Sequence, residues 1–230
     1  MKQYVTVPTV TPSSSPKRPA TRRTPHAKDR RRPMKNLEMI NDLLISNQGL
    51  ITTEEVLRSG ISKPSFYTII KELELKKAAH GVYVKDEAVI DREYILQLKY
   101  PKAVISHESA AFIHGLLSGR PVKLSVTLNT GINPSRLTES GIKVYTVKED
   151  LLNLGKSEIS NEYGRSVSIY NIERTVCDII RSRNKLNDDI LSGVLKAYVK
   201  RSDRDLVKLM LYAKSFRIRN IVREYLEILL

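Results

Sequence analysis

The segment 106–114 holds the side-chain types from which a nucleophilic catalyst is built. Ser106 supplies a hydroxyl and Glu108 a carboxylate. Imidazoles are supplied by His107 and His114. The Gly-x-Ser-x-Gly turn that exposes a catalytic serine is missing, and adjacent residues of one helix point in different directions, so no triad forms locally. The pattern favours Ser106 as a helix cap and His114 as a core or interface histidine, and the sequence predicts no catalytic residue.

Metal and phosphate chemistry have little support in the sequence. Four scattered histidines and one cysteine do not make a ligand set, and Cys177 has the apolar helix neighbours Val176 and Ile180. A Gly-rich phosphate loop is missing. Arg136 in NPSRL suits a phosphate at a helix N-terminus, yet capping by Asn133 explains the motif equally well. The sequence therefore predicts no metal and no cofactor, and its single cysteine suits the cytoplasm.

A different chemistry follows from residues 59–73, SGISKPSFYTIIKEL. Apolar residues recur there at i, i+3, i+4 and i+7, which predicts a helix with one buried face: Phe66, Ile69, Ile70 and Leu73. The outward face carries hydroxyls and cations: Lys63, Ser65, Tyr67, Thr68 and Lys71. Such side chains contact phosphates and base edges of DNA. The alternative is an ordinary solvated helix face.

The elements around this helix predict how it is held. Residues 34–47 and 50–60 form two further amphipathic helices, the second capped by threonines with Val56 and Leu57 inward. Ser62 caps the third helix after a short turn at Gly60. Residues 76–88 alternate as a basic β-ribbon that turns near Gly81. Three helices and such a ribbon are typical of a winged helix-turn-helix, predicted over residues 34–88.

This interpretation assigns two groups of DNA-binding residues. The third helix faces the major groove with Ser62, Lys63, Ser65, Tyr67, Thr68 and Lys71. The ribbon contacts the backbone with Lys76, Lys77, His80 and Lys85. The net charge of +14 and the pI of about 9.8 favour a polyanionic partner.

Much of that charge lies in the first 33 residues. They contain nine Lys/Arg and one acid, so 9 − 1 = +8 of the total belongs to them. Pro, Ser, Thr and Arg dominate the stretch without periodicity, which predicts a disordered basic tail over residues 1–33. We expect the first helix to begin at Met34. A DNA-binding tail, a transit peptide and an artefact of the start site remain open.

Residues 89–230 predict an α/β domain, so the fold class is α+β. Short strands at 122–128 and 142–147 and a hairpin near Gly164 indicate a short mixed sheet, followed by four helical stretches. The helix after Asn171 begins a run of cations that could form a basic strip: Arg174, Arg181, Arg183 and Lys185. The strip predicts either an antitoxin or second nucleic-acid surface, or a solvated face paired with Glu173 and Asp178.

Several strings resemble AbiEi-type antitoxins of type IV toxin–antitoxin systems, among them GLITTEEVLRSGISKPSFYTIIKELELKKAAHGVYV and IYNIERTVCDIIRSRN. Nearly all of residues 34–230 take part in the resemblance. It implies a cytoplasmic autorepressor that binds inverted repeats in its own promoter. It also implies an antitoxin that counteracts a nucleotidyltransferase-like toxin without requiring a stable complex.

Two other function classes stay open. A nucleic-acid-processing enzyme targeted by a winged helix would need clustered acids for metal ions, whereas the acids here are dispersed. A protein-interaction module would show no shift of DNA from its own upstream region. The sequence has no apolar run long enough to span a bilayer, so we expect no membrane partner.

Overall fold

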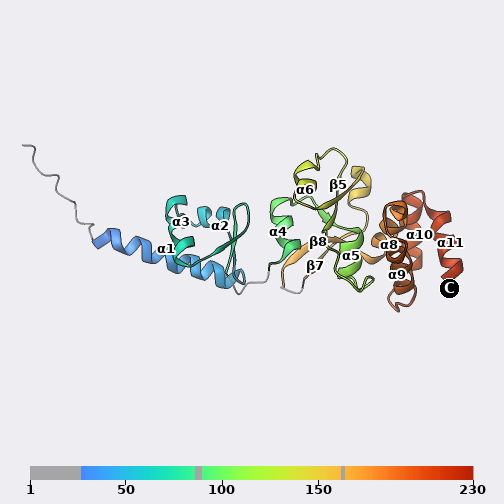
Figure 1. Ribbon diagram of the computed structural model, residues 1–230, viewed down its shortest axis with the longest axis horizontal. Helices are drawn as coiled ribbons and strands as arrows, with labels where there is room; N and C mark the ends of the chain where they lie inside the picture. Colours follow the sequence, from blue (N-terminus) through green and yellow to red (C-terminus); the bar gives the residue numbers. More distant parts are fainter. Residues whose placement is uncertain (1–26, 86–89, 162–163, 230) are drawn as a thin grey trace, which may run out of the picture.

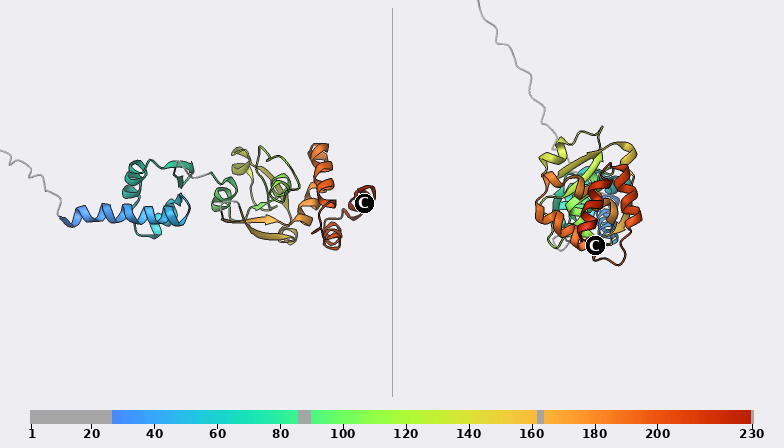
Figure 2. Two further views of the ribbon diagram at one scale, coloured as in Figure 1. Left: turned by 90° about the horizontal axis from the view of Figure 1, so that it is seen from below. Right: turned by 90° about the vertical axis from the view of Figure 1, so that its right-hand side faces the viewer.

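The computed structural model describes residues 27–85, 90–161 and 164–229. Helices and two small sheets make up a mixed α+β fold. An N-terminal unit (residues 27–85) and a C-terminal unit (residues 90–229) lie one after the other along the long axis, and the last helices lie farthest from the N-terminal unit (Figure 1). The view from below shows the same elongated arrangement, and the end-on view is narrow (Figure 2).

The N-terminal unit combines three helices with a three-stranded antiparallel sheet of order β1-β3-β2. Its elements in chain order are α1 (Ala27–Ser46), β1 (Leu50–Thr52), α2 (Thr53–Arg58), α3 (Lys63–Glu72), β2 (Lys76–Ala79) and β3 (Val82–Val84). Helix α1 begins at Ala27, seven residues before Met34, so the prediction of a helix start at Met34 is wrong. Arginine and lysine favour helix, and a formed helix extends at little cost. Residues 1–26 of the predicted tail lie outside the described residues.

The local signals of the N-terminal unit explain most of its elements. Thr52 and Glu55 form a capping box at the start of α2, with Thr52 Oγ1 accepting from the Glu55 amide at 3.2 Å. Val56 is buried as predicted, whereas Leu57 is exposed, because a six-residue helix has room for one inward position per turn. Strand β1 was not predicted, since it occupies only three residues between two helices.

Helix α3 forms as its apolar spacing predicts. Phe66 and Ile69 are buried, and Ile70 and Leu73 pack against the same core. The ring of Phe66 meets the ring of Tyr83 edge to face, with centroids 5.4 Å apart. The core that they share with α1 and α2 holds the outward face of α3 in place.

The C-terminal unit is built on a five-stranded mixed sheet of order β6-β5-β4-β8-β7. Its strands are β4 (Val104–Ile105), β5 (Ser125–Asn129), β6 (Lys143–Val147), β7 (Lys156–Ser160) and β8 (Ser166–Tyr170). Strands β5 and β6 pair in parallel, as do β4 and β8, and the β7–β8 hairpin is antiparallel. The short mixed sheet is therefore confirmed.

Helices cover this sheet and continue beyond it. They are α4 (Arg92–Lys99), α5 (His107–Ile113), α6 (Ser135–Glu139), α7 (Glu149–Leu152), α8 (Ile172–Arg181), the 3-10 turn η1 (Arg183–Lys185), α9 (Asp188–Val199), α10 (Leu206–Ser215) and α11 (Arg219–Leu229). The four C-terminal helices were predicted. Both interpretations of NPSRL assumed a helix start there, and α6 begins at this motif, whereas the four-residue α7 was not predicted.

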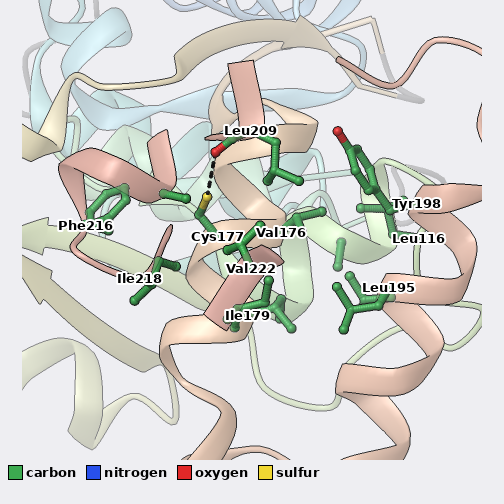
Figure 3. Close-up of a cluster of buried hydrophobic side chains, with 14 of the residues drawn as sticks. Leu116, Val176, Cys177, Ile179, Leu195, Tyr198, Leu209, Phe216, Ile218 and Val222 are labelled. Atoms are coloured by element: carbon green, nitrogen blue, oxygen red, sulfur yellow. Dashed lines mark hydrogen bonds between the residues drawn. The ribbon is translucent and has the colours of Figure 1, made fainter. Parts of the chain in front are cut away.

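Helix α8 lies at the centre of the largest core. Leu116, Leu195 and Val222 approach it from different elements (Figure 3). Cys177 is fully buried there, and its thiol donates to the carbonyl of Leu209 at 3.7 Å. Burial raises the pKa of the Cys177 thiol to about 12, so it remains protonated and inert. This agrees with the prediction of a small hydrophobe.

The two units share one apolar cluster. Leu50, Val82 and Val84 line one face of the N-terminal sheet, and Ile95 of α4 packs against them. All four side chains are at most 7% exposed. The N-terminal unit also has a core of its own on the other side of its sheet. The expectation that each half owns a separate core therefore holds only in part, because one sheet face is covered by the partner unit.

Candidate nucleic-acid interface

A groove of about 770 Å³ lies between the N-terminal unit and helices α4 and α6. The residues with charged or aromatic side chains on its walls are Glu54, Glu55, Arg58, Lys63, Tyr67, Lys77, His80, Tyr83, Lys99, Tyr100 and Arg136. Four of the ten predicted DNA-binding residues are among them: Lys63, Tyr67, Lys77 and His80.

The amino end of α3 forms one wall of the groove. Ser62 caps the helix through a 3.4 Å bond from the Ser65 amide, and the two hydroxyls lie 2.9 Å apart. Lys63 and Tyr67 follow one turn apart and are exposed, Tyr67 to 50%. The capping bond thus fixes the direction in which α3 presents a cation and a phenol to the groove.

The remaining predicted residues of α3 lie outside the groove. Thr68 is exposed and donates its hydroxyl to the carbonyl of Pro64 at 3.1 Å. Ser62 and Ser65 bond each other, as described above. Lys71 is exposed in the last turn. The hydroxyls therefore serve the helix itself, because serine and threonine compete readily for nearby backbone groups.

The β2–β3 ribbon forms a second wall and divides its cations between two faces. Lys77 pairs across the strands with Tyr83 and lines the groove, as does His80 at the turn. Lys76 is not on the groove, since successive side chains of a strand point to opposite faces, and the half-buried Lys85 lies beyond the end of β3 and outside the groove. The four ribbon residues thus do not form one surface.

Two cations of the groove come from the C-terminal unit and were not predicted to bind DNA. Lys99 ends α4, and Arg136 lies in the first turn of α6. The sequence did single out Arg136 in NPSRL, but nothing local showed that it faces α3. Asn133 Oδ1 accepts from the Ser135 amide at 3.0 Å just before α6, but the N-cap position of this helix is Pro134 and not Asn133 as expected. Only the packing of the two units brings these cations to the same groove.

The groove is electropositive. Five cations, from Arg58 to Arg136, line it against two acids, so 5 − 2 gives a formal charge of +3. Arg58 is paired with Glu54, and Glu55 serves the capping box. Within the described part of the chain, Lys63, Lys77, Lys99 and Arg136 form no ion pair with an acid. Cations that converge without counter-charges attract an extended anion.

The predicted basic strip does not form one continuous surface, because its first member, Arg174, is buried and not exposed as predicted. Arg174 is fully buried and lies over the ring of Tyr170, with its guanidinium carbon 3.8 Å from the centroid. Its Nε donates to Asp178 at 3.0 Å, and its Nη1 donates to the carbonyls of Leu151 and Leu154 at 2.7 and 2.5 Å. Other elements cover α8 on every side, so this arginine must be paired inside the protein.

The other members of the strip are more accessible. Arg181 donates to the second oxygen of Asp178 at 3.0 Å and its side chain is 29% exposed. Arg183 is half-buried, and Lys185 is exposed. Asp178 is thus held between two arginines, although its burial raises its pKa. The ion pair with Asp178 is the alternative that the sequence had left open, and it applies to both Arg174 and Arg181.

The segment that suggested a nucleophile forms a buried polar cluster. His107 stacks on Tyr145 with centroids 3.3 Å apart. Its Nδ1 lies 2.9 Å from Ser106 Oγ, and its Nε2 lies 3.1 Å from Ser182 Oγ. Ser106 begins α5 but makes no side-chain cap, because its hydroxyl bonds His107 and Thr127 instead. Burial, reinforced by nearby arginines and lysines, holds the pKa of His107 well below its usual value.

Glu108 and His114, the other two candidates of the segment 106–114, also bond within the fold. Glu108 is buried and accepts from Lys143 Nζ at 2.5 Å and from Ser125 Oγ at 3.1 Å. His114 Nε2 lies 2.7 Å from the carbonyl of Tyr170, as suits a core histidine. Burial lowers the pKa of His114. These side chains hold α5 to the sheet.

No family model and no curated protein matches the chain. Among solved structures, the fold is similar to the crystal structure of the RV2827C protein from Mycobacterium tuberculosis. The TM-score is 0.54 at 14% sequence identity, and the match covers 78% of this chain and 71% of that chain. At this identity the likeness concerns the fold alone.

Two further findings concern the described residues only. No helix among residues 27–85, 90–161 and 164–229 is both long and apolar enough to cross a membrane. In those same ranges, no three His, Cys, Asp or Glu side chains gather as they would around a metal ion.

Proposed function

We propose that the N-terminal unit is a winged helix-turn-helix that binds double-stranded DNA, and that the chain represses its own operon. The observation that carries the proposal is the groove, where Lys63 and Tyr67 of α3, Lys77 of the ribbon, and two cations of the C-terminal unit converge with an excess of positive charge. An extended strand of phosphates is the ligand that such a row of cations fits.

The geometry suggests separate roles for these residues. The exposed face of α3 enters the major groove, where Lys63 and Lys71 contact guanine edges or phosphates. The ribbon follows the backbone through Lys77 and His80. Lys99 and Arg136 contact the same strand from the opposite wall of the groove and so clamp its phosphates. Recognition of the DNA sequence then depends on α3, whereas the affinity for DNA depends on both units.

The antitoxin role rests on the resemblance to AbiEi-type proteins. The proposed partner is a nucleotidyltransferase-like toxin encoded beside the chain, and a stable complex is not required. Arg174 cannot contribute to that surface because it is fully buried. If the α8 region takes part, the accessible residues are Arg181, Arg183 and Lys185.

An electrophoretic mobility shift with DNA from the upstream region tests the DNA-binding proposal. We expect a specific complex that survives excess unrelated DNA, with an affinity that falls steeply with salt. The same preparation is incubated with magnesium, plasmid DNA and RNA. Cleavage of either would favour the alternative of a nucleic-acid-processing enzyme. Equal shifts of operator and unrelated DNA would contradict the repressor.

Co-expression with the neighbouring toxin gene tests the antitoxin role. The full chain should restore growth, and the variant Lys185→Glu, at an exposed position, should restore less if the α8 region is involved. Arg219→Glu on exposed α11 is the matched control. Growth arrest that the full chain does not relieve would contradict the antitoxin role and leave the repressor proposal intact.

A further inference from the structure

Arg165 joins the two units of the molecule. It precedes β8, and its side chain is 10% exposed. Its Nη2 donates to the carbonyls of Asn47 and Gln48 in the N-terminal unit at 3.2 and 3.3 Å. Its Nη1 donates to Asp91 of the C-terminal unit at 3.2 Å. One guanidinium therefore bonds both units from a nearly water-free position.

The surroundings of Arg165 are built to hold it. Asp91 is fully buried, caps α4 through the Tyr94 amide at 2.9 Å, and accepts from Asn161 Nδ2 at 2.7 Å. The guanidinium also lies over the Tyr94 ring, 5.3 Å from its centroid. The carbonyls of Asn47 and Gln48 follow the end of α1, where the helix dipole favours a cation. The planar fork of arginine suits this set of acceptors, and lysine does not.

We propose that Arg165 is a positioning residue for DNA binding. The connection between the units passes through four residues, 86–89, and the shared apolar cluster at Ile95 is small. The contacts of Arg165 set the angle at which the N-terminal unit meets α4. That angle decides whether Lys99 and Arg136 lie on the same groove as Lys63. The predicted effect of Arg165 on DNA binding rests on the proposed function. Its effect on the angle between the two units does not.

Spin labels test the geometric part without DNA. The labels are placed at Glu72→Cys and Glu139→Cys, both exposed and on opposite sides of the groove, since the native Cys177 is buried and does not react. We expect a narrow distance distribution in the parent and a broad one after Arg165→Ala. Arg165→Lys should be intermediate, and Arg219→Ala should match the parent. An unchanged distribution after Arg165→Ala would overturn the proposal.

Operator binding tests the positioning role. In the parent, Lys99→Ala/Arg136→Ala should weaken binding about tenfold, because two phosphate contacts are lost. After Arg165→Ala the same double substitution should have almost no further effect, since these cations no longer face the strand. A full tenfold loss in both backgrounds would overturn the positioning role.

Two further measurements distinguish a failure of the positioning role from a failure of the proposed function. Thermal unfolding is followed first, and if Arg165→Ala does not fold, Asp91→Asn replaces it, because asparagine preserves the cap of α4 while removing the charge that faces Arg165. A parent that binds no DNA would contradict the proposed function. The spin-label distances would then still decide whether Arg165 holds the units together.

Discussion

Helices α3 and α8 each carry cations at helical spacing, yet α3 exposes its lysines while α8 buries its first arginine. Helix α3 lies at the edge of a small unit, with one face on the core and one on the groove. Helix α8 is packed against α5, α9 and α10, and eight consecutive residues of it, 173–180, are buried. The comparison shows that a cation on an amphipathic helix becomes a binding residue only where tertiary packing leaves its face open.

The same comparison separates two uses of charge. On α3, lysines without partner acids provide electrostatic attraction to a ligand, and their loss should affect binding. On α8, Arg174 and Arg181 both form ion pairs with Asp178, and the loss of these pairs should affect folding.

The largest effect is expected at the buried pair. Arg174→Ala removes one partner of Asp178, leaves the carbonyls of Leu151 and Leu154 without their donor, and opens a void beside Tyr170. We expect a loss of about 3–5 kcal/mol in the free energy of unfolding, measured with urea. The exposed Arg219→Ala should change it by less than about 0.5 kcal/mol. Equal values for the two variants would break the comparison.

An intermediate effect is expected on α3. Lys63→Ala should weaken operator binding by about 1–3 kcal/mol with no change in the free energy of unfolding. Lys71→Ala should cost less, because Lys71 lies outside the groove. Titrations by fluorescence anisotropy measure both, with Lys214→Ala on α10 as the control. If Lys71→Ala costs more than Lys63→Ala, the contact surface is the C-terminal part of α3 and not the groove.

The smallest effect is a pH dependence at the end of α8, where His107 contacts Ser182. The pKa of His107 in the folded state lies well below its ordinary value of 6.5. As the pH falls, the unfolded state therefore binds a proton before the folded state does. The contribution of neutral His107 to the free energy of unfolding is fully present above about pH 6.5 and is lost as the pH falls below it. From pH 6.5 to 5.5 we expect a loss of about 1 kcal/mol from this residue.

Urea unfolding of the parent and of His107→Gln at several pH values measures this effect. The free energy of unfolding of the variant should depend less on pH than that of the parent. The ratio of the operator affinities of variant and parent should not change with pH, because His107 does not line the groove. An identical pH dependence in both proteins would mean that His107 does not titrate as its burial requires.

Local signals accounted for much of the fold. The capping residues Thr52 and Ser62 begin the helices that they were expected to begin, since a cap depends on neighbours in the chain. The apolar spacing of α3 and the hairpin at Gly164 were correct for the same reason. The elements that were not predicted, β1 and α7, are short, and too few of their residues carry a period.

The sequence by itself determined which side chains of α3 point outward, because helical spacing assigns Lys63 and Tyr67 to the face opposite Phe66. It also determined that Cys177 is inert. Only the tertiary structure decided that Lys99 and Arg136 join that face, that Arg174 is buried, and that Arg165 holds the units together. These outcomes depend on contacts between residues distant in the chain, such as Arg165 with Asn47, and no periodicity within a segment records which distant surface will cover it.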